Sequence, residues 1–312
     1  IYDNQLAWHV ASVAPASPAQ KVATFLGLAA ASISALSLVR HLDLGTPSGQ
    51  RNAQTGQVSV APIGNAKPVG AVASAEAAVR RIPGGGPDEP RVRVEKYTMP
   101  DGTRQFVVYV RGIEVMGGKH EAFDDESALD LYLRGQSSAS SEAINDALAA
   151  AGATSNDVIH GVGHSLGAMS LAHVALEGNY TFSTLVSVGS PVEAQVPVQT
   201  LSIHLRHTDD VVAKGLSGGG SPTSYGAPGS LIAERSYDPK GRIGDLLLGA
   251  HQLDGYIETA QKLDASPDPR VDAMRTVFTQ LGTATSVEAT TYSATRGVGK
   301  TLSDGSRRAG EI

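Results

Sequence analysis

From residue 91 onward, the apolar positions switch repeatedly between the period of a strand and that of a helix. Alternating or short apolar runs predict strands at 91–99, 104–110, 157–162, 184–191 and 199–207. Helical periodicity is found at 126–135, 141–152 and 168–178, and again from about residue 251. Strands that alternate with helices in this way predict an α/β fold with a mainly parallel, doubly wound sheet.

Residues 1–90 do not follow this alternation. The uncharged, alanine-rich stretch 22–39 predicts a helix and just reaches the length of a membrane span. Its serines, threonine and glycine make it only weakly apolar, so we interpret it as a helix packed in the core or on a partner. A membrane span and contact with a membrane surface are the alternatives. A Gly/Pro/Ser-rich stretch and a short helix at 71–81 complete this segment.

Three regions are expected along the chain. The breaker-rich stretch 82–90 marks the predicted boundary between an N-terminal helical and linker segment, 1–90, and a catalytic domain, 91–285. The last residues, 286–312, have no clear apolar stripe and are expected to form a tail or extended arm.

A nucleophile motif follows the apolar run at 158–162. Gly163-His164-Ser165-Leu166-Gly167 has the pattern Gly-x-Ser-x-Gly and opens a predicted helix. A strand, a sharp turn and a helix are the context that this motif requires in α/β-hydrolases, where the serine hydroxyl projects above the sheet. The glycines are needed because a Cβ beside so tight a turn would clash with neighbouring chain. We therefore predict that Ser165 is the nucleophile of a serine hydrolase with the α/β-hydrolase fold.

The base and the acid follow from chain order, which in this fold is Ser, then Asp or Glu, then His. Of the nine histidines, only His251 lies beyond the acids that follow the predicted strand at 199–207. That strand ends at two adjacent carboxylates. Asp209 is preferred because an Asp, one residue and then an apolar residue is the common spacing, and Asp210 is the second choice. We expect His207 to line the rim of the pocket.

Composition excludes several other classes of function. The net charge is −6 without a basic block, so a nucleic-acid partner is not expected. There is no cysteine, which rules out disulfides and thiolate nucleophiles. We find no spacing typical of metal ligands, and the predicted chemistry requires no cofactor.

An oxyanion hole needs two backbone N–H donors. One is expected from Leu166, directly after the nucleophile, and the other from the loop after the strand at 104–110, where Arg111, Gly112 and Ile113 follow. Gly112 and His164 are therefore further pocket candidates.

Five segments in chain order resemble the class 3 (fungal-type) lipase family over about residues 91–280. They are Tyr109-Val110-Arg111-Gly112-Ile113, Gly163 to Gly167, Val188-Gly189-Ser190-Pro191, an Asp-x-Val beginning at Asp209, and His251 with Tyr256 five residues on. The resemblance implies that the N–H of Ile113 completes the oxyanion hole. The chain departs from the family here, because the family has Ser or Thr at this place and Ile113 adds no hydroxyl.

The sequence thus predicts hydrolysis of a small-molecule or lipid acyl ester. Amide, carbamate or thioester hydrolysis and acyl transfer share the same triad and stay open, as does a secreted effector or interaction protein that carries a hydrolase core. The habits of the family and the absence of cysteine favour a secreted or cell-envelope-associated bacterial protein over a cytoplasmic one. Residues 117–127 form either a movable flap or a solvated loop, and 217–229 are expected to border the pocket.

Overall fold

The computed structural model describes most of the chain from residue 58 onward. The described residues are 7–9, 58–84, 89–113, 122–123, 138–192, 194–210, 212–213, 225–238 and 249–296. None of the helices in these ranges is both long and apolar enough to cross a bilayer. The predicted helices at 22–39 and 126–135 lie outside the described residues.

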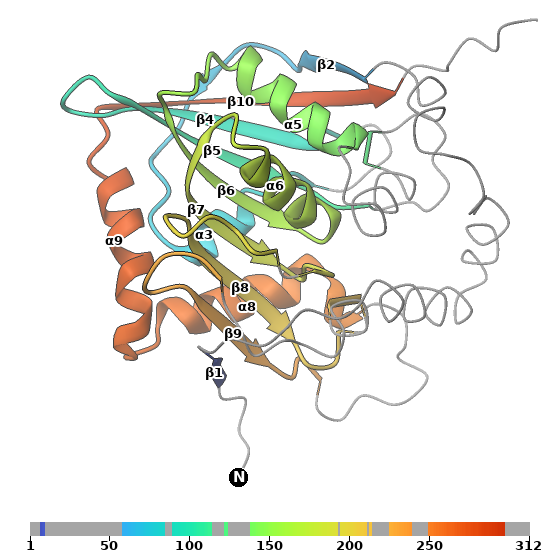
Figure 1. Cartoon of the computed structure of the whole chain (residues 1–312), viewed down its shortest axis with the longest axis vertical. Coiled ribbons are helices and arrows are strands. Elements are labelled where there is room, and N and C mark those ends of the chain that lie inside the picture. Colours follow the sequence, from blue (N-terminus) through green and yellow to red (C-terminus); the bar gives the residue numbers. More distant parts are fainter. Residues whose placement is uncertain are drawn as a thin grey trace, which may run out of the picture.

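Ten described strands form one mixed sheet (Figure 1). In order across the sheet they are β1 (Ala7–His9), β9 (Leu231–Arg235), β8 (Leu201–His207), β7 (Thr181–Val188), β6 (Val158–His164), β5 (Arg104–Val110), β4 (Val92–Thr98), β10 (Ser286–Arg296) and β2 (Val58–Pro62), with β3 (Lys67–Pro68) also paired to β10. Strands β5 to β9 are parallel. The pairs toward both edges are antiparallel. The α/β class is therefore confirmed, with the parallel order confined to the centre of the sheet.

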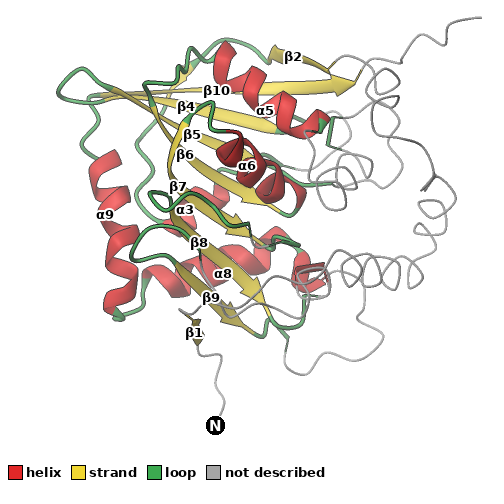
Figure 2. Cartoon of the chain, in the orientation of Figure 1, coloured by secondary structure: helices red, strands yellow, loops and turns green. Residues whose placement is uncertain are grey.

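Helices cover both faces of the sheet (Figure 2). Helices α5 (Ala139–Ala150) and α6 (Leu166–Glu177) pack on one face, and α3 (Ala75–Arg80), α8 (Leu253–Asp264) and α9 (Asp272–Leu281) pack on the other. The strand β5 supplies both cores, since successive side chains point to opposite faces. Phe106 and Val108 belong to the core under α5 and α6, whereas Val107 and Tyr109 belong to the core under α3 and α8.

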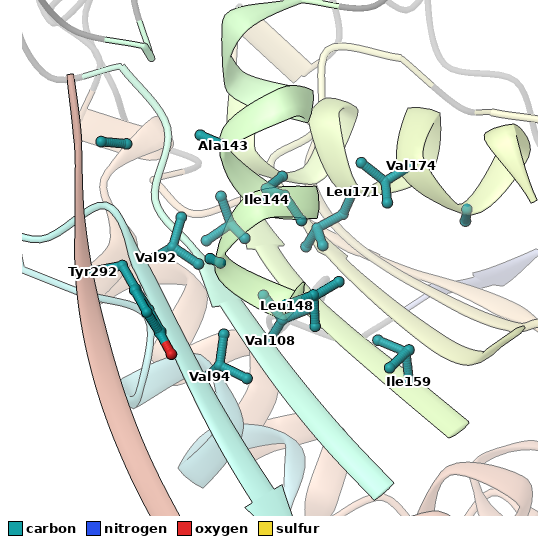
Figure 3. Close-up of a cluster of buried hydrophobic side chains, with 14 of the residues drawn as sticks. Val92, Val94, Val108, Ala143, Ile144, Leu148, Ile159, Leu171, Val174 and Tyr292 are labelled. Carbon is teal, nitrogen blue, oxygen red and sulfur yellow. The ribbon is translucent and has the colours of Figure 1, made fainter. Parts of the chain in front are cut away.

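The core under α5 and α6 joins residues from distant parts of the chain (Figure 3). Ile144 and Leu148 of α5 lie against Val92 and Val108 of the sheet, and Tyr292 of β10 lines the same cluster. Helix α5 begins at a capping box, in which the Ser138 side chain accepts from the N–H of Ser141 and the Ser141 side chain accepts from the N–H of Ser138.

The sheet extends beyond the predicted boundaries at residues 90 and 285. Strand β10 is not a tail, because it pairs with β4 over Ser286–Tyr292 and with β2 over Tyr292–Arg296. Its buried side chains change face along the strand: Val287 lies in the core under α3 and α8, whereas Tyr292 lies in the core under α5. The N-terminal helix α3 packs against α8, so 58–84 and 286–296 are part of one α/β unit with 91–285.

Glu95 on β4 forms a buried ionic cluster that links the sheet to Arg81, the C-terminal cap of α3. The Glu95 side chain is fully buried, and its Oε2 accepts from Arg81 at 2.7 Å, from the Tyr97 hydroxyl at 2.9 Å and from the Tyr109 hydroxyl at 3.0 Å. Its Oε1 accepts from Arg93. Each carboxylate oxygen therefore has partners, as a buried charge requires.

Candidate active site

Ser165 occupies a sharp turn between the end of β6 at His164 and the start of α6 at Leu166. Its φ of 55° and ψ of −124° make it the one non-glycine residue with positive φ in the described part of the chain. A Cβ on Gly163 would lie 2.7 Å from the backbone of Ala168. The turn that the sequence motif predicts is therefore present, and it needs glycine beside the serine because helix and strand approach closely.

His251 lies beside the Ser165 hydroxyl. It ends the 3₁₀ turn η3 (Gly249–His251), which precedes α8, and its Nε2 is 2.9 Å from the Ser165 Oγ. Both residues keep a small exposed fraction, 9% each. A neutral imidazole in this position can accept the hydroxyl proton, so the structure brings together the predicted nucleophile and the predicted base.

Asp210, the second-choice acid, contacts the other nitrogen of the base. The Asp210 Oδ2 lies 2.7 Å from Nδ1 of His251, and the Asp210 side chain is fully buried. Asp210 follows β8, so the three residues come from the carboxyl ends of β6 and β8 and from the turn before α8. This is the edge of a parallel sheet at which α/β proteins form their sites.

The preference for Asp209 is corrected by this geometry. The Asp209 carboxylate accepts the backbone N–H groups of Tyr237 at 2.9 Å and Asp238 at 2.7 Å, and the Ser236 hydroxyl at 3.2 Å. It therefore closes the turn after β9 and does not contact His251. Both residues lie in the turn that follows β8, and of the two carboxylates only that of Asp210 faces the base.

Asp210 is held as a carboxylate by its neighbours. Burial by itself would raise its pKa, but hydrogen bonds from His251, from the Tyr256 hydroxyl and from the N–H of Ala213, together with the charge of His251, lower the pKa below its ordinary value. The Oδ1 atom accepts the N–H groups of Val212 at 2.9 Å and Ala213 at 3.1 Å. The charge that would stabilise an imidazolium is thus fixed in place.

Two further histidines lie in the site, and neither lines a rim. His207 is fully buried and stacks on Tyr256, with ring centroids 3.9 Å apart and an interplanar angle of 4°. The expectation that His207 lines the pocket rim is therefore wrong. His164 is also buried, and its Nε2 lies 2.9 Å from the carbonyl oxygen of His251. His204 on β8 is also buried, as are all the residues of that strand.

The segment predicted to complete the oxyanion hole borders the nucleophile. A Cβ on Gly112 would lie 2.6 Å from the Ser165 Cβ and 3.1 Å from the Leu166 nitrogen. Leu166 is the first residue of α6, so its N–H has no partner within the helix. Ile113 follows directly and packs partly buried against the core under α5 and α6. Its side chain is apolar, so it contributes at most its backbone N–H.

The remaining predicted features of the site are only partly described. Of the segment 117–127, the structure describes Ala122 and Phe123, both fully buried, and of the loop 217–229 it describes residues 225–229. Within the described ranges, no group of three or more His, Asp or Glu side chains is arranged to hold a metal ion.

Comparison with models of known protein families, with characterised proteins and with solved structures finds no match to this chain. The chemistry of the site must therefore be argued from its geometry.

Tyr256 contacts the acid Asp210, a role that the sequence analysis did not assign to it. Its hydroxyl donates to Asp210 Oδ2 at 2.6 Å and accepts the N–H of His207 at 3.2 Å. The only signal in the sequence was its place five residues after His251, one turn into α8, where a side chain returns toward the turn that carries the base.

Proposed function

We propose that this protein is a serine hydrolase that cleaves carboxylic (acyl) esters through Ser165, His251 and Asp210. The α/β-hydrolase fold and the likeness to class 3 lipases belong to the same proposal. The arrangement of strand, strained serine and helix, together with the chain order of the three residues, supports both.

One observation carries the proposal: the two ring nitrogens of His251 have different partners. Nε2 lies 2.9 Å from the Ser165 hydroxyl and Nδ1 lies 2.7 Å from the Asp210 carboxylate. A carboxylate only accepts, so Nδ1 carries the proton and Nε2 presents its lone pair to the serine. This tautomer is the one in which histidine acts as a base.

The reaction follows from these positions. Nε2 of His251 takes the hydroxyl proton while Ser165 Oγ bonds to the ester carbonyl carbon, and the carbonyl oxygen becomes an oxyanion. The N–H of Leu166 and that of Gly112 or Ile113 stabilise that charge, aided by the N-terminus of α6. The N–H of Arg111 is not a candidate donor, because it donates to the carbonyl of Arg91 at 3.0 Å. When the bond to the alcohol breaks, His251 returns the proton to the leaving oxygen. Water, activated by the same histidine, then releases the acid from the acyl-enzyme.

Labelling with a fluorophosphonate, followed by peptide mapping, tests the nucleophile. We expect covalent label on Ser165 in the wild type and none in Ser165→Ala, with turnover of p-nitrophenyl esters lowered more than about 10⁴-fold in that variant. A folded wild-type protein that neither takes the label nor cleaves any ester would contradict the proposal.

A substrate panel tests the bond that is cleaved. Amides, carbamates and thioesters use the same triad, and none of the described contacts favours them over esters. We therefore compare p-nitrophenyl esters of graded acyl length with the matching p-nitroanilides. Faster cleavage of the anilides would replace the ester assignment by an amidase.

A further inference from the structure

Two consecutive backbone carbonyls beside the base accept hydrogen bonds from buried imidazoles. The carbonyl oxygen of Ala250 lies 2.7 Å from Nδ1 of His207, and the carbonyl oxygen of His251 lies 2.9 Å from Nε2 of His164. Neither imidazole touches the Ser165 hydroxyl or the Asp210 carboxylate. Each imidazole therefore hydrogen-bonds to the backbone of the short turn η3 and not to the reacting groups. The ring of His164 also lies beside that of His251, with ring centroids 4.9 Å apart.

These contacts fix the tautomer of each ring. A carbonyl only accepts, so His164 must carry its proton on Nε2 and His207 must carry its proton on Nδ1. Burial lowers the pKa of His164 to about 3 and that of His207 to about 4, so both rings are neutral near neutral pH. Each ring then has one N–H, and that N–H points at the backbone of η3.

The other nitrogen of His207 is held by a chain of donors. Nε2 of His207 lies 2.6 Å from the Thr259 hydroxyl oxygen, which in turn accepts from Nε of Arg235 at 2.7 Å. The Thr259 hydroxyl has two acceptors within reach, the carbonyl oxygen of Gly255 at 3.0 Å and Nε2 of His207 at 2.6 Å. Because the neutral ring accepts at Nε2 and is the nearer of the two, the hydroxyl proton points toward the ring. The guanidinium of Arg235 thus orders Thr259, which orders His207, which donates to Ala250.

His164 retains a polar ring at a cost. Its Nδ1 is buried and has no hydrogen-bond partner within the described structure. A leucine would avoid that penalty, since an unsatisfied buried polar atom destabilises a fold. The ring is therefore best explained by what its other nitrogen does, which is to donate to the carbonyl of His251.

We propose that His164 and His207 are positioning residues that fix the backbone of Ala250 and His251, and so the imidazole of His251, between the nucleophile and the acid. His164 directly precedes Ser165, and His207 lies three residues before Asp210. Each hydrogen bond thus ties the turn of the base to the strand end that carries one of its two partners. The inference rests on the proposed function for its kinetic consequence, but not for the tautomers.

Substitution of each histidine by Asn and by Gln tests the positioning role, because the amide that preserves kcat should differ between the two positions. The amide nitrogen of Gln reaches about the place of a histidine Nε2, and that of Asn about the place of Nδ1. His164→Gln and His207→Asn keep the donor to the backbone, so we expect kcat within about threefold of wild type. His164→Asn and His207→Gln lose the donor, and we expect kcat to fall about 10- to 100-fold with KM unchanged, because a small misplacement of the base has an effect of that order.

His160→Gln is the matched control. His160 lies on β6 four residues before His164, is buried, and contacts Gln105 through Nε2 at 3.0 Å. Loss of this imidazole should leave kcat unchanged. A purely structural role for His164 and His207 predicts that Asn and Gln act alike at each position, so the reversed order of the two amides is the decisive kinetic result. Equal kcat for Asn and Gln at both positions would overturn the proposal.

Long-range ¹⁵N–¹H correlation spectra of the histidine rings supply a readout that does not require turnover. We expect His164 as the Nε2–H tautomer and His207 as the Nδ1–H tautomer in the wild-type protein. The opposite tautomer at either ring would overturn the proposal, even if variants failed to fold. The expected tautomers in a protein that takes no fluorophosphonate would leave the positioning role standing and would contradict the proposed function alone.

Discussion

The hydroxyl of Tyr256 donates a hydrogen bond of 2.6 Å to Asp210 Oδ2, the same atom that holds Nδ1 of His251 at 2.7 Å. The acid of the candidate triad is thus bound from two sides at one oxygen. Tyr256 is itself fixed, because it is fully buried and stacks on His207. A neutral donor at this place spreads the negative charge of the carboxylate without adding a second charge.

Tyr256→Phe removes that donor and keeps the ring. The carboxylate then attracts the proton of His251 more strongly, so the acid limb of the kcat/KM profile should move to higher pH. We expect kcat to fall by about tenfold, corresponding to the about 1.5 kcal/mol typical of a hydrogen bond to a charged group. A pH–rate series with one p-nitrophenyl ester measures both. An unmoved acid limb would mean that Tyr256 only packs.

Asp210→Asn and Asp209→Asn form a matched pair. Asn at 210 has no charge to stabilise the imidazolium of His251, and its amide NH₂ can donate to Nδ1 and so hold the unproductive tautomer. We therefore expect kcat to fall by about 10⁴-fold. Asn at 209 keeps an oxygen for only one of the two backbone N–H groups, those of Tyr237 and Asp238, that Asp209 accepts at its two oxygens. It makes no hydrogen bond to His251, so kcat should change less than about threefold. Ester turnover in the two variants checks the acid, and the reverse result would restore Asp209.

Gly112→Ala tests how closely the oxyanion segment borders the nucleophile. The added methyl would meet the carbonyl of His164 at 2.8 Å and the Cβ of Ser165 at 2.6 Å, so the backbone must shift. We expect kcat/KM to fall at least about 100-fold, the order seen when an oxyanion donor is displaced. Gly70→Ala is the control, because a Cβ there has no atom within 4 Å. Full activity of Gly112→Ala would exclude this segment from the site.

We expect the protein to lose stability as the pH falls below about 6.5, at pH values still above those at which carboxylates titrate. Burial lowers the pKa of His160, His204 and His207 to about 4 and that of His164 to about 3. The unfolded chain binds these protons near its ordinary value of about 6.5, whereas the folded chain does not. The unfolded state therefore binds more protons below about pH 6.5, and the free energy of unfolding falls as the pH falls toward 4.

For four such groups, the slope of the free energy of unfolding against pH should approach about 5 kcal/mol per pH unit, as an upper bound. Urea unfolding at a series of pH values measures the slope, which should be about a quarter smaller in His204→Gln. A free energy of unfolding that stayed constant between pH 6.5 and 4.5 would contradict the neutral buried rings. The lowered pKa values of Asp209 and Asp210 add a further loss only at more acid pH.

Glu95→Gln should affect stability without affecting catalysis. The change leaves Arg81 and Arg93 facing a neutral amide in a buried site, and breaking a buried ion pair from one side costs about 3–5 kcal/mol. Glu288→Gln on β10 breaks only the exposed pair with Lys96, for which we expect less than about 1 kcal/mol. Chemical unfolding compares the two, and kcat should be unchanged in both.

The sequence was sufficient for the centre of the sheet and insufficient for its edges. Runs such as 104–110 and 158–164 are apolar because both faces are covered by helices, and they were recognised. Strand β10 was missed because only Val287 and Tyr292 among its buried residues are large and apolar, and because the buried side chains change face near Thr291. Strand β9, Leu231–Arg235, was missed because it is short and follows a Gly/Ser/Pro-rich loop.

In the site, too, the features that adjacent residues determine were predicted from the sequence, whereas contacts between distant residues were not. The turn at Ser165 is encoded by adjacent residues, and chain order alone singled out His251. Asp209 and Asp210 both satisfy an Asp, one residue and an apolar residue, so spacing could not separate them. The choice depends on which side chain faces the base across the sheet edge. The contacts of His164, His207 and Tyr256 join residues 43 to 87 apart in the chain, so no local pattern predicts them.

The backbone of Ser165 implies a conflict between stability and activity at this position. A serine at φ 55° and ψ −124° costs about 1–3 kcal/mol that a glycine would avoid. If stability were the only requirement, Ser165→Gly would be favoured. A related protein that no longer needed catalysis would become more thermostable through that single substitution. A serine that is retained here although it lowers stability is what a function of its hydroxyl requires.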